Sequence, residues 1–165
     1  MNTTAPRIYV ACLAAYNAGK LHGRWIDADQ DADAIRAEVA DMLAQSPEPR
    51  AEEWAIHDFE GFGDYRLSEW ESFDDVAALA AQIEKHGHAY LAALALSSSR
   101  EEADALMDEY RGHWDTPEDF AQDFAEETGS IPKDLPAWLH IDWESTAREL
   151  LYDMAEHDGH YFWRT

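Results

Sequence analysis

Apolar and polar positions along residues 1–62 follow the pattern of a small sheet covered by one helix. The β-rich run RIYVACLAAY (7–16) and the run LHGRWIDA (21–28) predict two strands joined by a turn at NAGK. EEWAIHDFEG (52–61) alternates apolar and polar positions and predicts a third strand. Between them, four apolar residues recur at the spacing of one helix face and predict a helix over 32–45: Ile35, Val39, Met42 and Leu43.

Residues 63–98 carry the signals of two helices. Ser72 and Asp75 form a capping box, and Gly87 ends the helix that it opens. The apolar positions of this helix share one face: Val76, Leu79, Ala80 and Ile83. The run HAYLAALALSSS predicts a second, nearly apolar helix. We therefore expect a central helical domain over 63–98, after an N-terminal α+β domain over 1–62.

Residues 99–165 mix helical and extended patterns. Ser99 and Glu102 cap a third helix, EYRGHWDT reads as a short strand, and DTPEDFAQDFAEETG is a helix that begins at Thr116 and ends at Gly129. Asp142 caps a last helix whose apolar positions run to Met154, and HDGHYFWRT predicts a turn and an edge strand. The fold class expected for the whole chain is α+β, in three small domains, with a mixed α/β unit over 99–165.

Charge changes this picture more than any other property of the composition. The chain of 165 residues has 35 acids and 12 bases, a formal net charge of −23, although 46% of its residues are hydrophobic. Residues 1–50 hold 7 acids and 5 bases, whereas residues 51–165 hold 28 acids and 7 bases. Such a field repels nucleic acid and anionic membranes and attracts basic surfaces. We expect a folded protein with a basic partner, and neither nucleic acid nor membrane binding.

Cellular location is suggested by what the sequence lacks. Cys12 is the only cysteine, so an intramolecular disulfide is impossible. The N-terminus has no basic-then-apolar signal layout, and the apolar run AYLAALAL (89–96) is too short to span a bilayer. The sequence thus predicts a cytoplasmic protein.

Catalytic and metal-binding motifs are weak. His86 and His88, the pair Glu53 and His57, and the pair Glu156 and His160 have chelating spacings, but the eight histidines are scattered and have no cysteine partner. Histidines on the surface or on strands are the alternative. The many carboxylates do not single out a catalytic pair, and no nucleophile or phosphate-loop motif is present. We expect no enzyme, no cofactor and no metal, and a metal-dependent enzyme stays an alternative.

Acidic residues are the strongest candidate for function. Asp115, Asp119, Asp123 and Glu126 recur every three to four residues on one helix face, at an axial spacing of about 6 Å that resembles phosphate spacing. Glu126 and Glu127 lie near the helix C-terminus, where the dipole disfavours them, so local stability does not explain them. The candidate surface, called the acidic set below, comprises Asp58, Glu60, Asp64, Glu69, Glu71, Asp74, Asp75, Asp104, Asp108, Asp115, Glu118, Asp119, Asp123, Glu126 and Glu127.

The amount of charge also suits a DNA mimic. Duplex DNA carries about one charge per 1.7 Å, so 23 charges at that density would cover about 40 Å, a little more than the width of a compact chain of this length. A generally acidic or salt-adapted protein is the alternative, and the presence of only three lysines fits it too.

Two sequence blocks resemble a known family. The block YNAGKLHGRWIDA, the block EEWAIHDFEGF and the acidic stretch DTPEDFAQDFAEE are similar to the ArdA-type antirestriction proteins, and the similarity runs from about Pro6 to Trp163. The resemblance implies a non-catalytic protein of plasmids and other mobile elements. It also implies an elongated chain of three small domains that forms a homodimer, with the dimer contact expected in the C-terminal unit.

The resemblance further implies a partner and a mechanism. The partner is a type I restriction–modification enzyme, whose methyltransferase core binds the protein in its DNA-binding groove. The acidic set then stands where phosphates of B-form DNA would lie and blocks the enzyme competitively. An acidic adaptor or chaperone for a basic DNA-associated protein is the alternative function.

Overall fold

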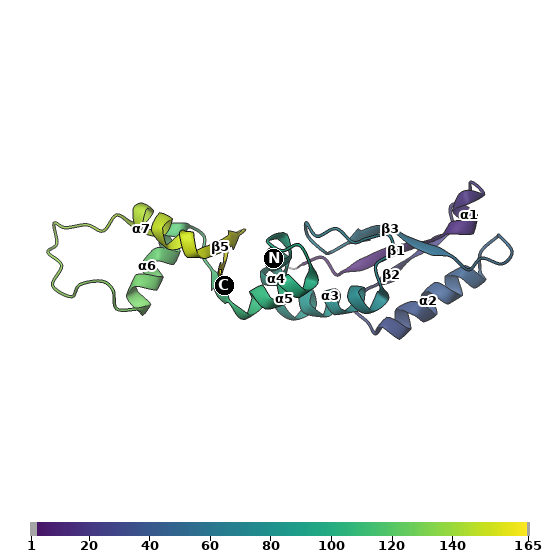
Figure 1. The fold of residues 1–165 in the computed structure, drawn as a ribbon, viewed down its shortest axis with the longest axis horizontal. Coiled ribbons are helices and arrows are strands. Elements are labelled where there is room, and N and C mark those ends of the chain that lie inside the picture. The colour runs from purple at the N-terminus through teal and green to yellow at the C-terminus, as the bar shows by residue number, and fades with distance from the viewer. Residues whose placement is uncertain (1–2, 165) are drawn as a thin grey trace. The chain divides into compact units, whose positions relative to one another are not determined.

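The computed structural model describes residues 3–164. Within them it contains seven α-helices, one 3-10 helix and two antiparallel sheets of three strands each (Figure 1). The expected α+β class is confirmed. The chain divides into two compact units, Met1–Leu91 and Ala92–Thr165. The finer division into three domains, at 62/63 and 98/99, stays a prediction.

The sheet of the N-terminal unit has β1 (Arg7–Cys12) at its centre. β2 (Gly23–Asp27) and β3 (Trp54–Glu60) pair with it on either side, both antiparallel. Ile8 and Val10 of the central strand are fully buried, as expected for a strand with two neighbours. A bulge opposite the Tyr9–Val10 step inserts one extra residue, His57, into β3.

The first strand is shorter than the sequence predicts. It ends at Cys12, and a short helix, α1 (Leu13–Asn17), replaces the expected extension to Tyr16. Leucine and alanine have high helix propensity, and Leu13, Ala14 and Ala15 are enough for one turn here. The NAGK turn is confirmed, with Gly19 at a φ of 76°.

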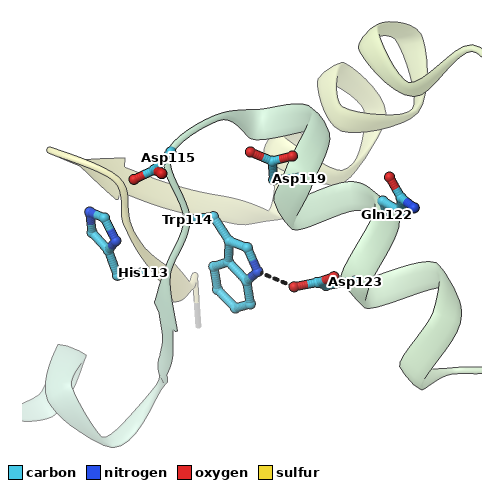
Figure 2. A pocket seen from close by; sticks show the side chains of 6 residues that line it. All are labelled: His113, Trp114, Asp115, Asp119, Gln122 and Asp123. Carbon is cyan, nitrogen blue, oxygen red and sulfur yellow. Dashed lines mark hydrogen bonds between the residues drawn. The ribbon is translucent and has the colours of Figure 1, made fainter.

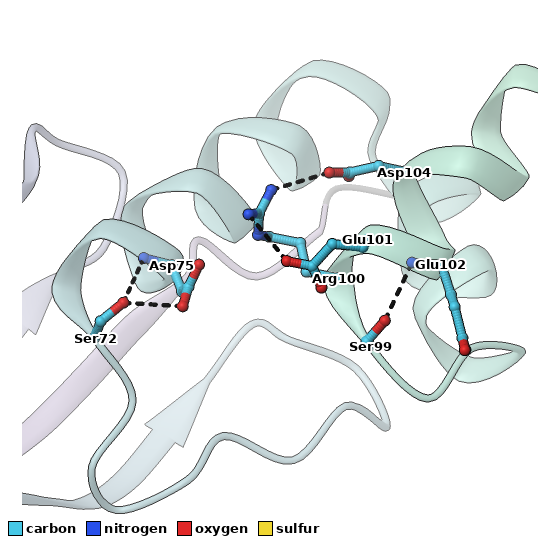
Figure 3. Close-up of polar contacts among 7 residues, drawn as sticks. All are labelled: Ser72, Asp75, Ser99, Arg100, Glu101, Glu102 and Asp104. Carbon is cyan, nitrogen blue, oxygen red and sulfur yellow. Dashed lines mark hydrogen bonds and ion pairs between the residues drawn. The ribbon is translucent and has the colours of Figure 1, made fainter.

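Two helices of the N-terminal unit match their predictions closely. α2 (Ala32–Ala44) packs on β2 and buries Ile35, Val39 and Met42. α3 (Phe73–His86) packs against α2, and Gly87 follows it at a φ of 59°. The Ser72 Oγ accepts a hydrogen bond from the Asp75 amide at 3.1 Å, which confirms the capping box (Figure 3). α4 (His88–Ala95) follows directly, also as predicted.

The C-terminal unit is built from three helices and a second sheet. Its helices are α5 (Arg100–Asp108), α6 (Pro117–Glu127) and α7 (Trp143–Leu150), the last continued by the 3-10 turn Leu151–Asp153. The predicted caps Ser99, Thr116 and Asp142 each accept the expected backbone hydrogen bond. Gly129, at a φ of 67°, lies one residue beyond the helix cap of α6, Thr128.

The sheet of this unit corrects two expectations. Its strands are β4 (Tyr110–His113), β5 (Met154–His157) and β6 (His160–Trp163), in the order β4-β6-β5. The last strand, β6, is therefore central and not an edge strand. It forms a hairpin with β5 on one side and pairs with the distant β4 on the other. Met154 belongs to β5 and is buried in the core, whereas the helix ends at Leu150.

Aromatic residues form the core of this unit. Phe120, Met154 and Tyr161 are buried together, and the Phe120 ring stacks on Tyr161 with centroids 4.6 Å apart. Five half-buried side chains pack around them: Trp114, Phe124, Leu150, Leu151 and Trp163. The core thus fixes α6 on the sheet through the apolar face of the helix, which leaves its acidic face outside.

Candidate acidic binding surface

Acids of the N-terminal unit follow one stretch of chain, from β3 through the connection after it to the first turn of α3. Five are exposed, and Glu71 and Asp75 are half-buried. The members of the acidic set in this unit are Asp58, Glu60, Asp64, Glu69, Glu71, Asp74 and Asp75. Because none is buried, each of these carboxylates can meet solvent or a partner.

Hydrogen bonds hold several of these carboxylates in place. Glu60 Oε2 accepts from Arg7 Nε at 2.8 Å, and Asp74 pairs with Arg36. Asp75 accepts from the Ser72 hydroxyl at 2.9 Å (Figure 3). Glu71 accepts from the Ser68 amide at 3.1 Å. A carboxylate held in this way loses less freedom when a partner binds it.

Acids of the C-terminal unit lie on α5 and around α6. Asp104 and Asp108 are one helical turn apart on α5, and Asp104 accepts from Arg100 at 3.0 Å (Figure 3). The remaining members are Asp115, Glu118, Asp119, Asp123, Glu126 and Glu127, of which only Glu118 is half-buried and the rest are exposed. The structure thus keeps all fifteen members of the acidic set at the surface, seven in one unit and eight in the other.

The acids at the start of α6 line a shallow hollow of about 430 Å³. Asp115, Asp119 and Asp123 surround it together with His113, Trp114 and Gln122 (Figure 2). Asp119 and Asp123 lie one helical turn apart on α6, as predicted, whereas Asp115 precedes the helix cap Thr116 and Glu126 does not line the hollow. The hollow is therefore an acidic depression with one indole in its wall.

Glu126 and Glu127 have partners in the fold that the sequence did not reveal. Glu126 accepts a hydrogen bond from Gln122 Nε2 at 3.2 Å, and Glu127 pairs with Arg111 of β4 at 3.1 Å. These contacts offset the unfavourable position near the helix C-terminus. Both acids therefore have partners of their own, one within the helix and one on β4.

Most bases of the chain contact acids of the chain itself. Seven of the twelve bases do so in the residues described: Arg7, Lys20, Arg24, Arg36, Arg100, Arg111 and Arg148. Hydrogen bonds that the guanidinium groups donate to carboxylates raise the pKa of Arg7, through Glu60, and of Arg36, through Asp33 and Asp74. Positive charge is thus compensated locally, and the surface offered to a partner is mostly negative.

Nearby acids also affect the ionisation of the core. Burial raises the pKa of the Tyr161 hydroxyl, and the negative charges of Glu156, Glu118 and Asp119 raise it further. Burial alone raises the pKa of Tyr110. Hydrogen bonds from Ser145 lower the pKa of Asp142, the cap of α7. None of these shifts moves a pKa toward neutral pH, because those of arginine and tyrosine rise and that of Asp142 falls.

The candidate metal ligands serve other contacts. Glu156 accepts from the Gly159 amide at 2.8 Å, and His160 Nδ1 lies 2.8 Å from the Tyr110 hydroxyl. His57 packs edge-on against Tyr16. Within residues 3–164, no group of three His, Cys, Asp or Glu side chains is placed to hold a metal ion.

Sequence reasoning missed two acids at a second hollow. Asp29 and Asp31, in the loop before α2, line a depression of about 410 Å³ together with Asp74 of the acidic set. The run DADQDAD carried the signal, but most acids of the chain lie after residue 51, so the predicted surface did not include this run. The sequence also showed no sign that Trp114 would be a hydrogen-bond partner of Asp123.

Among residues 3–164, no helix is both long enough and apolar enough to cross a membrane.

Together, these features define a small acidic α+β binding protein whose carboxylates lie outside and whose bases are largely engaged by its own acids. A search of curated proteins gave no match to the chain. The family model of the ArdA antirestriction proteins matches residues 8–162, and the chain belongs to that family. Members of the family are not enzymes. They inhibit type I restriction–modification by mimicking DNA, so the predicted family, antirestriction function and lack of catalysis are confirmed.

Proposed function

We propose that the acidic set is the surface that imitates DNA phosphates, and that it occupies the DNA-binding groove of the methyltransferase core. The observation that supports this most is that none of the fifteen carboxylates is buried, although 46% of the chain is hydrophobic. Fast, electrostatically steered association follows from such a surface. The protein then acts in the cytoplasm, encoded on a mobile element, as an elongated chain of three small domains.

A competition experiment tests the proposal. A labelled duplex with the recognition sequence is bound to a purified type I methyltransferase core, and the protein is added. We expect the duplex to be displaced at near-stoichiometric amounts of protein, because both occupy one groove. Fluorescence anisotropy of the duplex reports the release.

Unrelated basic proteins serve as the control in this experiment. Equal binding to all of them would favour an acidic adaptor over a DNA mimic. Binding to the methyltransferase core without release of the duplex would contradict the shared groove.

We infer that the protein forms a homodimer through the loop between α6 and α7. Residues 130–141 of this loop contain no buried side chain, and Figure 1 shows the segment as an open connection between the two helices. Trp138 is 78% exposed and Leu139 is 46% exposed. The loop has one acid, Asp134, and one base, Lys133, so it is formally neutral in a chain of charge −23. Two copies can approach most easily where their mutual repulsion is weakest.

Replacing Trp138 and Leu139 together by serine is expected to convert the dimer to a monomer of 18.8 kDa. Sedimentation equilibrium measures the mass. Trp70→Ser, at another exposed tryptophan in the other unit, is the control and should leave the mass unchanged. Added salt should tighten the wild-type dimer, because it screens like charges. A wild-type chain that is monomeric at all salt concentrations would refute the dimer.

A further inference from the structure

One carboxylate of the acidic set is held by a tryptophan. Trp114 follows β4 directly, and its indole Nε1–H donates to Asp123 Oδ2 of α6 at 2.7 Å (Figure 2). This is a short bond with an ionised acceptor, the stronger class of hydrogen bond. The donor and the acceptor are nine residues apart and come from different elements.

The indole itself has little freedom. Its ring packs edge-on against Phe120, with centroids 4.9 Å apart, and against Tyr161 at 5.7 Å. The Trp114 amide donates to the Gly159 carbonyl at 2.9 Å. A Cβ on Gly112 would lie 3.1 Å from the Trp114 ring, so this glycine leaves room for the ring. The core of the C-terminal unit therefore fixes the direction of the Nε1–H bond.

The chemistry of the donor matters because the indole is neutral. Arg111 also fixes a carboxylate of α6, Glu127, but it cancels that negative charge at the same time. Trp114 fixes Asp123 and leaves its full negative charge facing the hollow. A phosphate mimic needs both a fixed position and an uncompensated charge, and the indole supplies the first without removing the second.

We propose that Trp114 is a positioning residue that preorganises Asp123 for binding to the restriction enzyme. This inference rests on the proposed role of the acidic set. An Asp123 side chain released from the indole would have to be ordered again on binding, which weakens association. Loss of the bond should therefore raise the concentration for half-inhibition by roughly two- to ten-fold.

A double-mutant cycle with Trp114→Phe and Asp123→Ala tests the proposed positioning role of Trp114. Trp114→Phe removes the donor and keeps an aromatic ring, so we expect the two- to ten-fold loss in the wild-type background and no further loss in the Asp123→Ala background. Equal losses in both backgrounds would mean that Trp114 acts through packing, and no loss in the wild type would mean that its bond is irrelevant. Either result overturns the proposal.

Further variants separate positioning from stability. Asp123→Glu keeps the charge and displaces the carboxylate, so it should weaken inhibition as Trp114→Phe does, and it keeps the test valid if Trp114→Phe fails to fold. Full inhibition by Asp123→Glu would refute the proposal. Trp163→Phe, another packed tryptophan of the same unit, is the control and should inhibit normally.

A spectroscopic measurement distinguishes this proposal from the function on which it rests. The indole N–H signal of Trp114 in a ¹H–¹⁵N spectrum should shift in Asp123→Ala, whether or not the protein inhibits any enzyme. If the wild-type protein inhibits but the Trp114 indole signal does not shift in Asp123→Ala, the positioning role alone is refuted. If the signal shifts in Asp123→Ala but the wild-type protein inhibits no type I enzyme, the proposed function is refuted, and with it the role of Trp114 in inhibition.

Discussion

Raising the NaCl concentration from about 50 mM to about 200 mM is expected to weaken binding of the protein to the methyltransferase core by on the order of a hundred-fold. Binding brings an acidic surface against the Lys and Arg side chains of a DNA groove, so salt ions screen both the approach and the complex. A DNA-binding protein that makes six to ten phosphate contacts loses about 10³- to 10⁵-fold in affinity for DNA over this range. The loss expected for the protein is smaller because seven of its twelve bases compensate part of the acidic surface.

Direct titration calorimetry or surface plasmon resonance is the right measurement, since competition against DNA would mix two salt dependences. Most of the change should lie in the association rate, because steering acts before contact. Self-association of the protein is the matched control, because the affinity of the dimer contact should rise with salt while binding to the enzyme weakens. Binding to the enzyme that does not change with salt would contradict an electrostatic mimic and would favour recognition through exposed apolar residues such as Trp70.

Helices were predictable because their signals are local. Ser72, Ser99, Thr116 and Asp142 each cap the helix that the sequence assigned to them, and a capping bond joins residues only three apart. The apolar faces of α2 and α3 were also visible as simple periodicities. Propensity and period therefore determine these elements with little help from tertiary contacts.

Strands of the C-terminal unit were harder because their pairing is distant. β6 is central because β4 (Tyr110–His113), about fifty residues earlier in the sequence, pairs with it. β5 has four residues and no clear alternation, so it read as the end of a helix. The Asp158–Gly159 pair was the signal available, since Asp-Gly between short strands favours a two-residue hairpin, and both residues have positive φ.

Acidic residues could be predicted as a set, but not the contacts that hold them. Helix period placed Asp119 and Asp123 one turn apart on α6, and Asp115, just before the helix, lines the same hollow. The bond from Trp114 to Asp123 depends on how β4 packs on the core, and the pair Arg111–Glu127 depends on it as well. Such contacts are tertiary, and no periodicity in the sequence encodes them.

Replacing Phe120 by alanine is expected to destabilise the C-terminal unit by about 3–5 kcal/mol. The Phe120 side chain is fully buried, stacks on Tyr161 and contacts the Trp114 ring, so its loss leaves a cavity at the centre of a small core. Whole domains are stable by only about 5–15 kcal/mol, so this change removes a large fraction of the total. Chemical denaturation of the full chain, followed by circular dichroism, measures it.

Tyr152→Ala is the matched control for this substitution. Tyr152 belongs to the same unit but is 71% exposed, so its removal should change the free energy of unfolding by less than about 0.5 kcal/mol. Inhibition by Phe120→Ala should fall together with stability, although every carboxylate of α6 is still present, because the apolar face of the helix is what holds its acidic face in position. A variant that loses this stability yet inhibits fully would show that charge alone suffices, and that a rigid arrangement of carboxylates is not required.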